Sequence, residues 1–242
     1  MYTLFKKEFR SFFSSLTGYI VIIAFLIING LFIWVFPGVN NILESGYASL
    51  NGLFTIAPWI FLFLAPAVTM RMFSDEKKTG TIELLLTRPL SDFQIIFAKF
   101  IAALVLVLFS ILPTLIYFYT VYVLGNPVGN IDTGGTWGSY IGLFFLAAIY
   151  VSIGVLSSSV TDNQIVAFIV GMLLCFIMYI GFDYLSELAT LKSNDTIINL
   201  GINEHYKSMS RGVIDSRDMV YFISVIAFFL LITKTKLQSR KW

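Results

Sequence analysis

The sequence contains almost no cysteine or histidine, the residues that most often form disulfides, bind metals or act in catalysis. Cys175 is the only cysteine and His205 the only histidine among 242 residues. No internal disulfide and no cysteine-rich metal cluster can therefore form. Charged residues make up 12% of the chain, against about 25% in soluble domains, and 57% of the residues are hydrophobic. This balance predicts a polytopic membrane protein of the all-α class.

Nucleotide-binding and enzyme motifs are missing as well. No G-x-x-x-x-G-K-[ST] sequence occurs, so the chain has no P-loop for ATP. No G-x-S-x-G, H-E-x-x-H or Cys/His zinc spacing occurs either. A serine–histidine enzyme would need His205 beside the serines at 157–159, which the predicted topology places on the opposite side of the membrane. We therefore expect no enzyme activity, cofactor or metal in this chain, and we interpret His205 as a surface or loop residue.

The chain contains six apolar runs that could cross a membrane, since a helical span needs roughly 20 apolar residues. They are residues 18–36, 53–70, 95–124, 137–160, 164–184 and 218–233. Capping boxes at Ser91–Gln94 and Thr161–Gln164 are predicted to start the third and fifth spans. Single Gly and Pro residues are expected to kink the spans, and neighbouring helices can bond the freed carbonyls. These residues are Gly30, Pro58, Pro66 and Pro113.

The distribution of lysine and arginine predicts the orientation of the chain. With a cytoplasmic N-terminus, twelve of the sixteen fall in inner segments, Lys99 among them, and four fall in outer segments. Both termini and residues 71–94 are therefore expected in the cytoplasm. Residues 1–16 carry phenylalanines on one side and basic residues on the other, which predicts an interfacial helix, or alternatively a positive flank that orients the first span. Residues 185–217 form the largest outer segment, and their apolar pieces suggest a return toward the membrane surface.

The interiors of the predicted spans suggest what kind of transport is possible. We expect no Asp, Glu, Lys, Arg or His in a span core, which argues against a self-powered transporter, although sodium can bind carbonyls and hydroxyls. The fourth span carries small residues that favour close helix packing, with a pore-lining surface as the alternative. They are Ala147, Ala148, Ser152, Gly154, Ser157, Ser158 and Ser159.

Residues 75–94 form a polar stretch between the second and third spans. Residues 75–78 are predicted to be a solvated turn, followed by a short helix from about Gly80 to Thr87 that Thr79 caps and Pro89 ends. Ile82, Leu85 and Leu86 would share one face of this helix. The helix could be a loop whose leucines seal the bundle. It could also be a docking site, because the chain has no energy source of its own and a push here would move two spans.

The residues of this stretch resemble the cytoplasmic loop of ABC-2-type transporter permeases. The pattern is E-x-x-x-G-T-I-E-x-L-L-x-x-P from Glu76 to Pro89, followed by Ile95, Ile96 and Lys99. The N-terminal interfacial helix, the six spans and the outer segment before the last span resemble the same family over essentially the whole chain. Within it, the chain looks most like the permease associated with gliding motility in Bacteroidetes.

The resemblance implies a permease subunit in the bacterial inner membrane with a coupling helix at residues 76–88. A separate P-loop ATPase, which would bind ATP and Mg, would dock there. The implied interface residues are Glu76, Gly80, Thr81, Glu83, Leu84 and Arg88. A second six-span permease chain, identical or not, would complete the pathway, in the lipid bilayer and without a nucleic-acid partner. Export is the usual direction in this family.

One other function fits the sequence, and a third is disfavoured. A membrane anchor could recruit an ATPase or motility machinery through the same helix without moving a substrate. An intramembrane enzyme would need a reactive constellation that the sequence lacks. The cargo is open, because the apolar and aromatic spans are compatible with lipid-linked, peptide or polysaccharide substrates.

Overall fold

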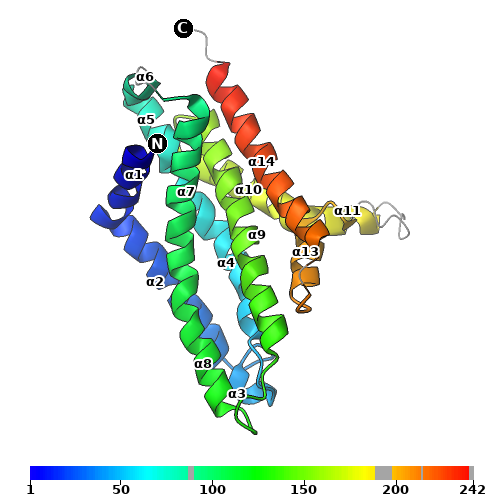
Figure 1. Cartoon of the computed structure of the whole chain (residues 1–242). Coiled ribbons are helices and arrows are strands. Elements are labelled where there is room, and N and C mark those ends of the chain that lie inside the picture. Colours follow the sequence, from blue (N-terminus) through cyan, green and yellow to red (C-terminus); the bar gives the residue numbers. More distant parts are fainter. Residues whose placement is uncertain (87–89, 189–197, 214, 240–242) are drawn as a thin grey trace.

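The computed structural model describes residues 1–86, 90–188, 198–213 and 215–239, with only the backbone for 84–86 and 187–188. Every regular element within these ranges is a helix (Figure 1). In the part of the chain that the structure describes, six helices are long and apolar enough to cross a membrane, which confirms an all-α polytopic architecture. They are Leu16–Val35, Asn51–Lys78, Asp92–Leu124, Thr133–Val160, Gln164–Ser186 and Ser216–Gln238.

The first three spans are each built from more than one helical piece. The pieces are α2 (Leu16–Gly30) with the π-helix η1 (Leu31–Val35), α4 (Asn51–Thr69) with α5 (Arg71–Lys78), and α7 (Asp92–Ile111) with the 3₁₀ turn η2 (Leu112–Thr114) and α8 (Leu115–Leu124). The changes of helix type at Gly30 and Pro113 fall at two predicted kinks. At Pro113 the cause is the missing backbone N–H of proline, which breaks the α-helical ladder.

The last three spans lie in the second half of the chain. They are α9 (Thr133–Val160), α10 (Gln164–Phe176) with the π-helix η3 (Ile177–Gly181) and α11 (Phe182–Leu188), and α14 (Ser216–Gln238). Four short helices flank the spans: α1 (Tyr2–Ser14), α3 (Ile42–Ser45), α6 (Thr81–Leu86) and α13 (Ile202–Met209). The sixth span is longer than the predicted 218–233 because Asp215 caps its start by accepting from Arg217 N at 2.9 Å.

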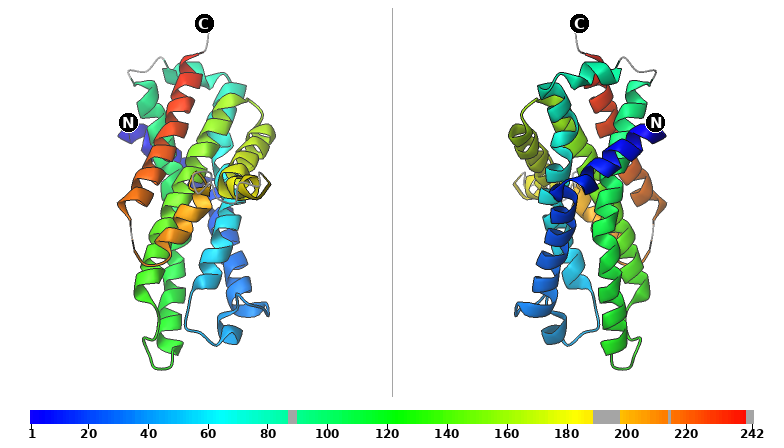
Figure 2. Two further views of the ribbon diagram at one scale, coloured as in Figure 1. Left: turned by 90° about the vertical axis from the view of Figure 1, so that its right-hand side faces the viewer. Right: turned by 90° about the vertical axis from the view of Figure 1, so that its left-hand side faces the viewer.

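The bundle has two distinct ends. One end, here called the α6 end, carries α1, α5, α6 and the last turns of α14, so both terminal helices lie toward this end (Figures 1 and 2). The other, the α3 end, carries α3 and the tip of α8, while α11 and α13 lie at the side of the bundle (Figure 1). This arrangement agrees with an even number of spans.

Helix α9 is the centre of the bundle. In the apolar window of α9, 83% of the residues are buried, against 22% in the span that begins with α10. The small residues of α9 explain this, because a Cβ at Gly154 would overlap Thr69 of α4. Ser157 in turn lies against Gly171 of α10. The small residues of the fourth span therefore pack helices within the chain, as predicted, and do not line a pore.

The two predicted capping boxes have different outcomes. The Ser91 box is confirmed, because Ser91 Oγ accepts from Gln94 N at 3.3 Å and Gln94 Oε1 accepts from Ser91 N at 3.2 Å. The prediction for Thr161 is wrong. Asn163 caps α10 instead, and its Oδ1 accepts from Ile165 N at 2.9 Å. Asn and Asp are the strongest capping residues and here prevail over Thr161 two positions upstream.

The segment 185–217 returns to the bundle through α13, which packs against α9. Its Tyr206 hydroxyl donates to the Phe54 carbonyl of α4 at 2.8 Å. That carbonyl would normally bond the N–H four residues later, which is Pro58 and has none. A neighbouring helix therefore supplies the donor that proline removed, as predicted for kinked spans. Burial also raises the pKa of Tyr206 well above its usual range, so the phenol keeps its proton.

Helix α1 has the predicted amphipathic pattern. Lys6, Lys7 and Arg10 are exposed, while Phe9 and Phe13 pack on Phe109 of α7 with ring centroids 6.1 and 6.0 Å apart. The helix therefore lies along the third span as well as presenting a basic side. Its basic side chains are in position to face lipid headgroups.

Candidate functional site

The charged stretch after the second span is helical. Residues 75–78 belong to α5, which extends the second span to Lys78, so the predicted solvated turn at these residues is wrong. The cause is that Asp75, Glu76 and Lys77 are half-buried and bonded to other helices, and only Lys78 is exposed. Tertiary contacts thus keep residues 75–78 helical, although their charges alone predict a turn.

The turn comes five residues after Asp75, at Gly80. Gly80 has φ +70°, in the left-handed region, and nothing surrounds the position where a side chain would begin. Glycine is therefore needed for the backbone conformation that ends α5, and steric space is no constraint. Thr79 closes α5 by donating to the Asp75 carbonyl at 2.8 Å, and α6 starts at Thr81. The predicted short helix exists between Thr81 and Leu86.

Among the described charged side chains at the α6 end, that of Lys99 is the most deeply buried. Its side chain is 1% exposed, and Nζ lies 2.8 Å from Glu76 Oε1 of α5 and 3.1 Å from Glu8 Oε1 of α1. Nζ also donates to the Met72 carbonyl at 2.7 Å, so all three ammonium hydrogens have acceptors. Lys7 lies 3.6 Å from Glu8 and 3.8 Å from Glu76. We call Lys7, Glu8, Glu76 and Lys99 the Lys99 cluster.

The Lys99 cluster places a charged residue within the third span. Lys99 is the eighth residue of α7, which starts at Asp92, and α1, α5 and α7 enclose it at the α6 end. Removing one partner of a buried ion pair costs about 3–5 kcal/mol, because the other charge stays buried without compensation. The cluster therefore requires α1, α5 and α7 to keep their relative positions. A lone lysine in the apolar run IIFAKFIAAL was the available signal, since buried lysines are almost always paired.

Two further contacts join α5 to the fourth and fifth spans. Lys77 Nζ donates to the carbonyl of Ser159, in the last turn of α9, and Gln164 Nε2 donates to Asp75 Oδ1. A cation at the end of α9 is favourable because the last carbonyls of a helix carry partial negative charge. Helix α5 is thus bonded to α7, α9 and α10 and, through Lys99, to α1.

The residues predicted as a docking interface fall into three groups. Gly80, Thr81 and Glu83 are exposed at the tip of the α6 end. Glu76 faces inward in the Lys99 cluster. Leu84 lies in α6 with only its backbone described, and Arg88 lies outside the described residues. Ile82, between the exposed residues, is 7% exposed and anchors α6 to the core, as the predicted apolar face requires.

Groups that could perform chemistry have structural partners. His205 lies on α13, with Nδ1 2.7 Å from Asp218 Oδ1 and its ring stacked 3.8 Å from that of Tyr221. The hydroxyls at 157–159 bond carbonyls of their own helix, and Cys175 is buried. The described residues contain no group of His, Cys, Asp or Glu that could hold a metal ion.

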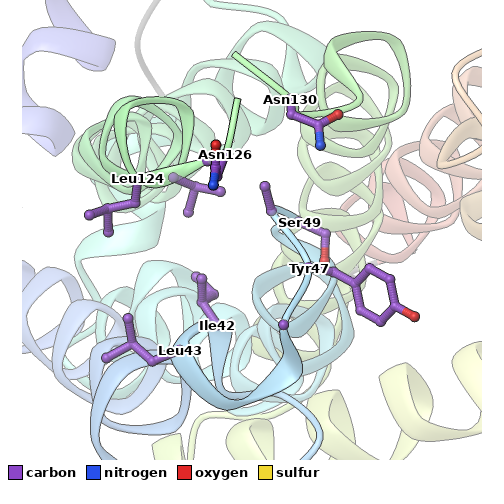
Figure 3. Close-up of a pocket in the computed structure, with 11 residues that line it drawn as sticks. Ile42, Leu43, Tyr47, Ser49, Leu124, Asn126 and Asn130 are labelled. Atoms are coloured by element: carbon purple, nitrogen blue, oxygen red, sulfur yellow. The ribbon is translucent and has the colours of Figure 1, made fainter. Parts of the chain in front are cut away.

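A hollow of about 530 Å³ lies at the α3 end between α3 and the tip of α8 (Figure 3). The labelled side chains come from α3, from the residues just after it, and from α8 and the loop that follows (Figure 3). Its lining is apolar, hydroxyl or amide, without a charged side chain. This hollow offers no carboxylate, imidazole or thiol.

These observations define a polytopic helical membrane protein with a braced, partly exposed turn at one end. A family model described as ABC-2 family transporter protein matches residues 2–235. The chain therefore belongs to the ABC-2 transporter family and is a membrane-spanning permease component of an ABC transporter. Members of this family are transport components that act with an ATP-binding subunit and are not themselves catalytic. A comparison with curated protein sequences finds no significant match.

Proposed function

We propose that this chain is one permease half of an exporter, driven by a separate P-loop ATPase that docks on the α6 end. The observation that carries the proposal is the exposed turn at Gly80, Thr81 and Glu83, which stands on α5. Because α5 is bonded to α7, α9 and α10, a displacement of this turn reaches four of the six spans. Such transmission needs a helical bundle with two stable arrangements, and no catalytic residue.

The proposal includes an orientation and an assembly. The excess of lysine and arginine supports a cytoplasmic α6 end, with both termini inside and the chain in a bacterial inner membrane. A second six-span chain, identical or different, would complete the pathway. The resemblance to the gliding-motility permease of Bacteroidetes supports export linked to motility. The same docking turn would serve a membrane anchor, which differs in moving no substrate.

Changes of charge at the docking turn test this function. Glu83→Lys and Leu84→Asp should abolish co-purification of the ATPase and all transport-linked activity while the protein stays folded in the membrane. Glu44→Lys is the matched control, because Glu44 is exposed on α3 at the other end. ATPase association and activity that survive both changes would refute the docking site. Association without any substrate-dependent change in ATP hydrolysis would support the anchor.

A further inference from the structure

One face of α4 is left uncovered by the rest of the chain. Asn51, Thr55, Trp59 and Phe63 follow each other at four-residue spacing and are all exposed, although the residues between them are buried or half-buried. Residues four apart lie on one side of a helix. Along this face the side chains change from polar at the α3 end to aromatic toward the middle of the bundle.

A hollow with both polar and aromatic lining opens beside the first half of this face. It has a volume of about 530 Å³ and lies between α4, η3 and α13. Its polar lining consists of Asn51, Thr55, Ser139, Asn203, Lys207 and Ser210, together with aromatic side chains. Lys207 is exposed and is the one charged residue of the lining, which contains no carboxylate. Asp183, outside the lining, accepts from Asn203 Nδ2 at 2.7 Å. We call this cavity the head hollow.

An apolar groove continues along the second half of the same face. It has a volume of about 440 Å³ and lies between α4 and the pair α2 and η1. Apart from Trp59, its lining is Ile28, Phe32, Ile56, Ile60, Phe63 and Leu64. Trp59 lines both the groove and the head hollow, so the two are neighbours along α4. We call this second part the tail groove.

We propose that the head hollow and the tail groove together bind one anionic lipid of the leaflet at the α3 end. The phosphate would lie by Lys207 and Asn51, and one acyl chain would follow α4 past Trp59 to Phe63. Along α4 the head hollow comes first and the tail groove second. This order matches a lipid whose headgroup lies nearer the α3 end and whose acyl chain points toward the middle of the bundle. From Trp59, where the headgroup would meet the chain, to Phe63 the helix rises about 6 Å. The tail groove would therefore hold the first part of an acyl chain within the roughly 15 Å of hydrocarbon in one leaflet.

Charge and amphipathy favour a lipid over other occupants. The single cation of the head hollow complements an anionic headgroup, and an apolar groove without polar lining atoms suits a chain of methylenes. Tryptophan is enriched where headgroups meet chains, which is the place of Trp59 in this assignment. The proposal does not depend on the ATPase or on the direction of transport.

Quenching of Trp59 fluorescence by brominated lipids tests the site. The chain has four tryptophans, so Trp34→Phe, Trp137→Phe and Trp242→Phe leave Trp59 alone. This full-length variant is reconstituted in phosphatidylcholine vesicles in which one lipid in ten carries bromines. Brominated phosphatidylglycerol should quench about threefold more than brominated phosphatidylcholine, as expected for one partly exposed ion pair.

Two charge variants show whether the preference comes from the head hollow. Lys207→Gln should reduce the ratio of quenching by the two lipids to one. Arg211→Gln, which removes an exposed cation outside the lining, should keep the threefold ratio. A ratio of one before any charge is removed would mean unselective contact with lipid and would overturn the proposal. A preference that survives Lys207→Gln, or absent quenching because another chain covers the groove, would overturn it as well.

Discussion

The two ends of the bundle use their polar residues in different ways. At the α6 end, charged side chains turn inward and bond helices to each other, as Lys99 does to Glu8 and Glu76. At the α3 end, polar side chains mostly bond backbone groups, as Asn41 Oδ1 does by accepting from Leu43 N. Along α13 they bond both the backbone and other side chains, as Tyr206 does to the Phe54 carbonyl and His205 does to Asp218. Two hollows of about 530 Å³ remain there. The α6 end is thus braced between helices, and the other region is open.

This difference suggests that the two regions have different mechanical roles. A braced end transmits a push as one body, because moving α5 alone would separate buried charges. An open, hydrogen-bonded region can change its shape at lower cost, since a neutral hydrogen bond contributes only about 1 kcal/mol. The comparison therefore predicts graded effects of mutation, largest at the Lys99 cluster.

Loss of the central cation should have the largest effect. Lys99→Met leaves Glu8 and Glu76 beside each other without the buried cation and should destabilise the protein by about 3–5 kcal/mol. The measurement is the unfolding free energy in detergent by denaturant titration. Lys78→Met, which changes an exposed lysine of α5, the helix that carries Glu76, should change the stability by less than about 0.5 kcal/mol.

A triple variant sharpens this test. Glu8→Gln and Glu76→Gln added to Lys99→Met remove the uncompensated charges, so much of the lost stability should return. If Lys99→Met unfolds like Lys78→Met, or if the triple variant is no more stable than Lys99→Met alone, the cluster does not brace the α6 end.

Loss of the Tyr206 hydroxyl should lower the stability by a smaller amount than loss of Lys99. The hydroxyl is needed because Pro58 has no N–H to bond the Phe54 carbonyl. Tyr206→Phe leaves the Phe54 carbonyl without a donor and should cost about 1–3 kcal/mol. Pro58→Ala restores a backbone N–H to that carbonyl, so Tyr206→Phe should cost much less in that background. A double-mutant cycle measured by denaturant titration gives this coupling. If Tyr206→Phe lowers the stability equally with and without Pro58→Ala, the Tyr206 hydroxyl does not replace the N–H that Pro58 lacks.

Gly80 should show the smallest of these effects. Alanine there must adopt the left-handed conformation and should cost about 1 kcal/mol, whereas Asn, which tolerates it, should cost less. Gly134→Ala in the first turn of α9 is the control, with no positive φ and only ordinary contacts. Thermal unfolding in detergent orders the three variants. An alanine at position 80 that unfolds like the Gly134 variant would mean that the turn is not fixed by its backbone conformation.

The sequence predicts the architecture better than it predicts the site. Apolar length identifies six spans, and the small residues of α9 identify close packing, because both depend on local composition. The partners of Lys99 are not local, since Glu8 and Glu76 lie 91 and 23 residues away. Charge alone therefore placed residues 75–78 in a solvated turn. The lone lysine in an apolar run and the proline at 58 each signalled that a partner was needed, without saying which.

Crosslinking from the exposed turn tests the central claim most directly. Thr81→Cys in a Cys175→Ser background places one thiol on the α6 end, and Leu43→Cys places one on the exposed α3. Each variant is crosslinked in native membranes, purified in detergent and analysed by mass spectrometry. We predict that a P-loop ATPase is attached through position 81 and absent at position 43. Attachment of only lipid or of this same chain at position 81 would contradict the account, because the turn would then be a structural seal.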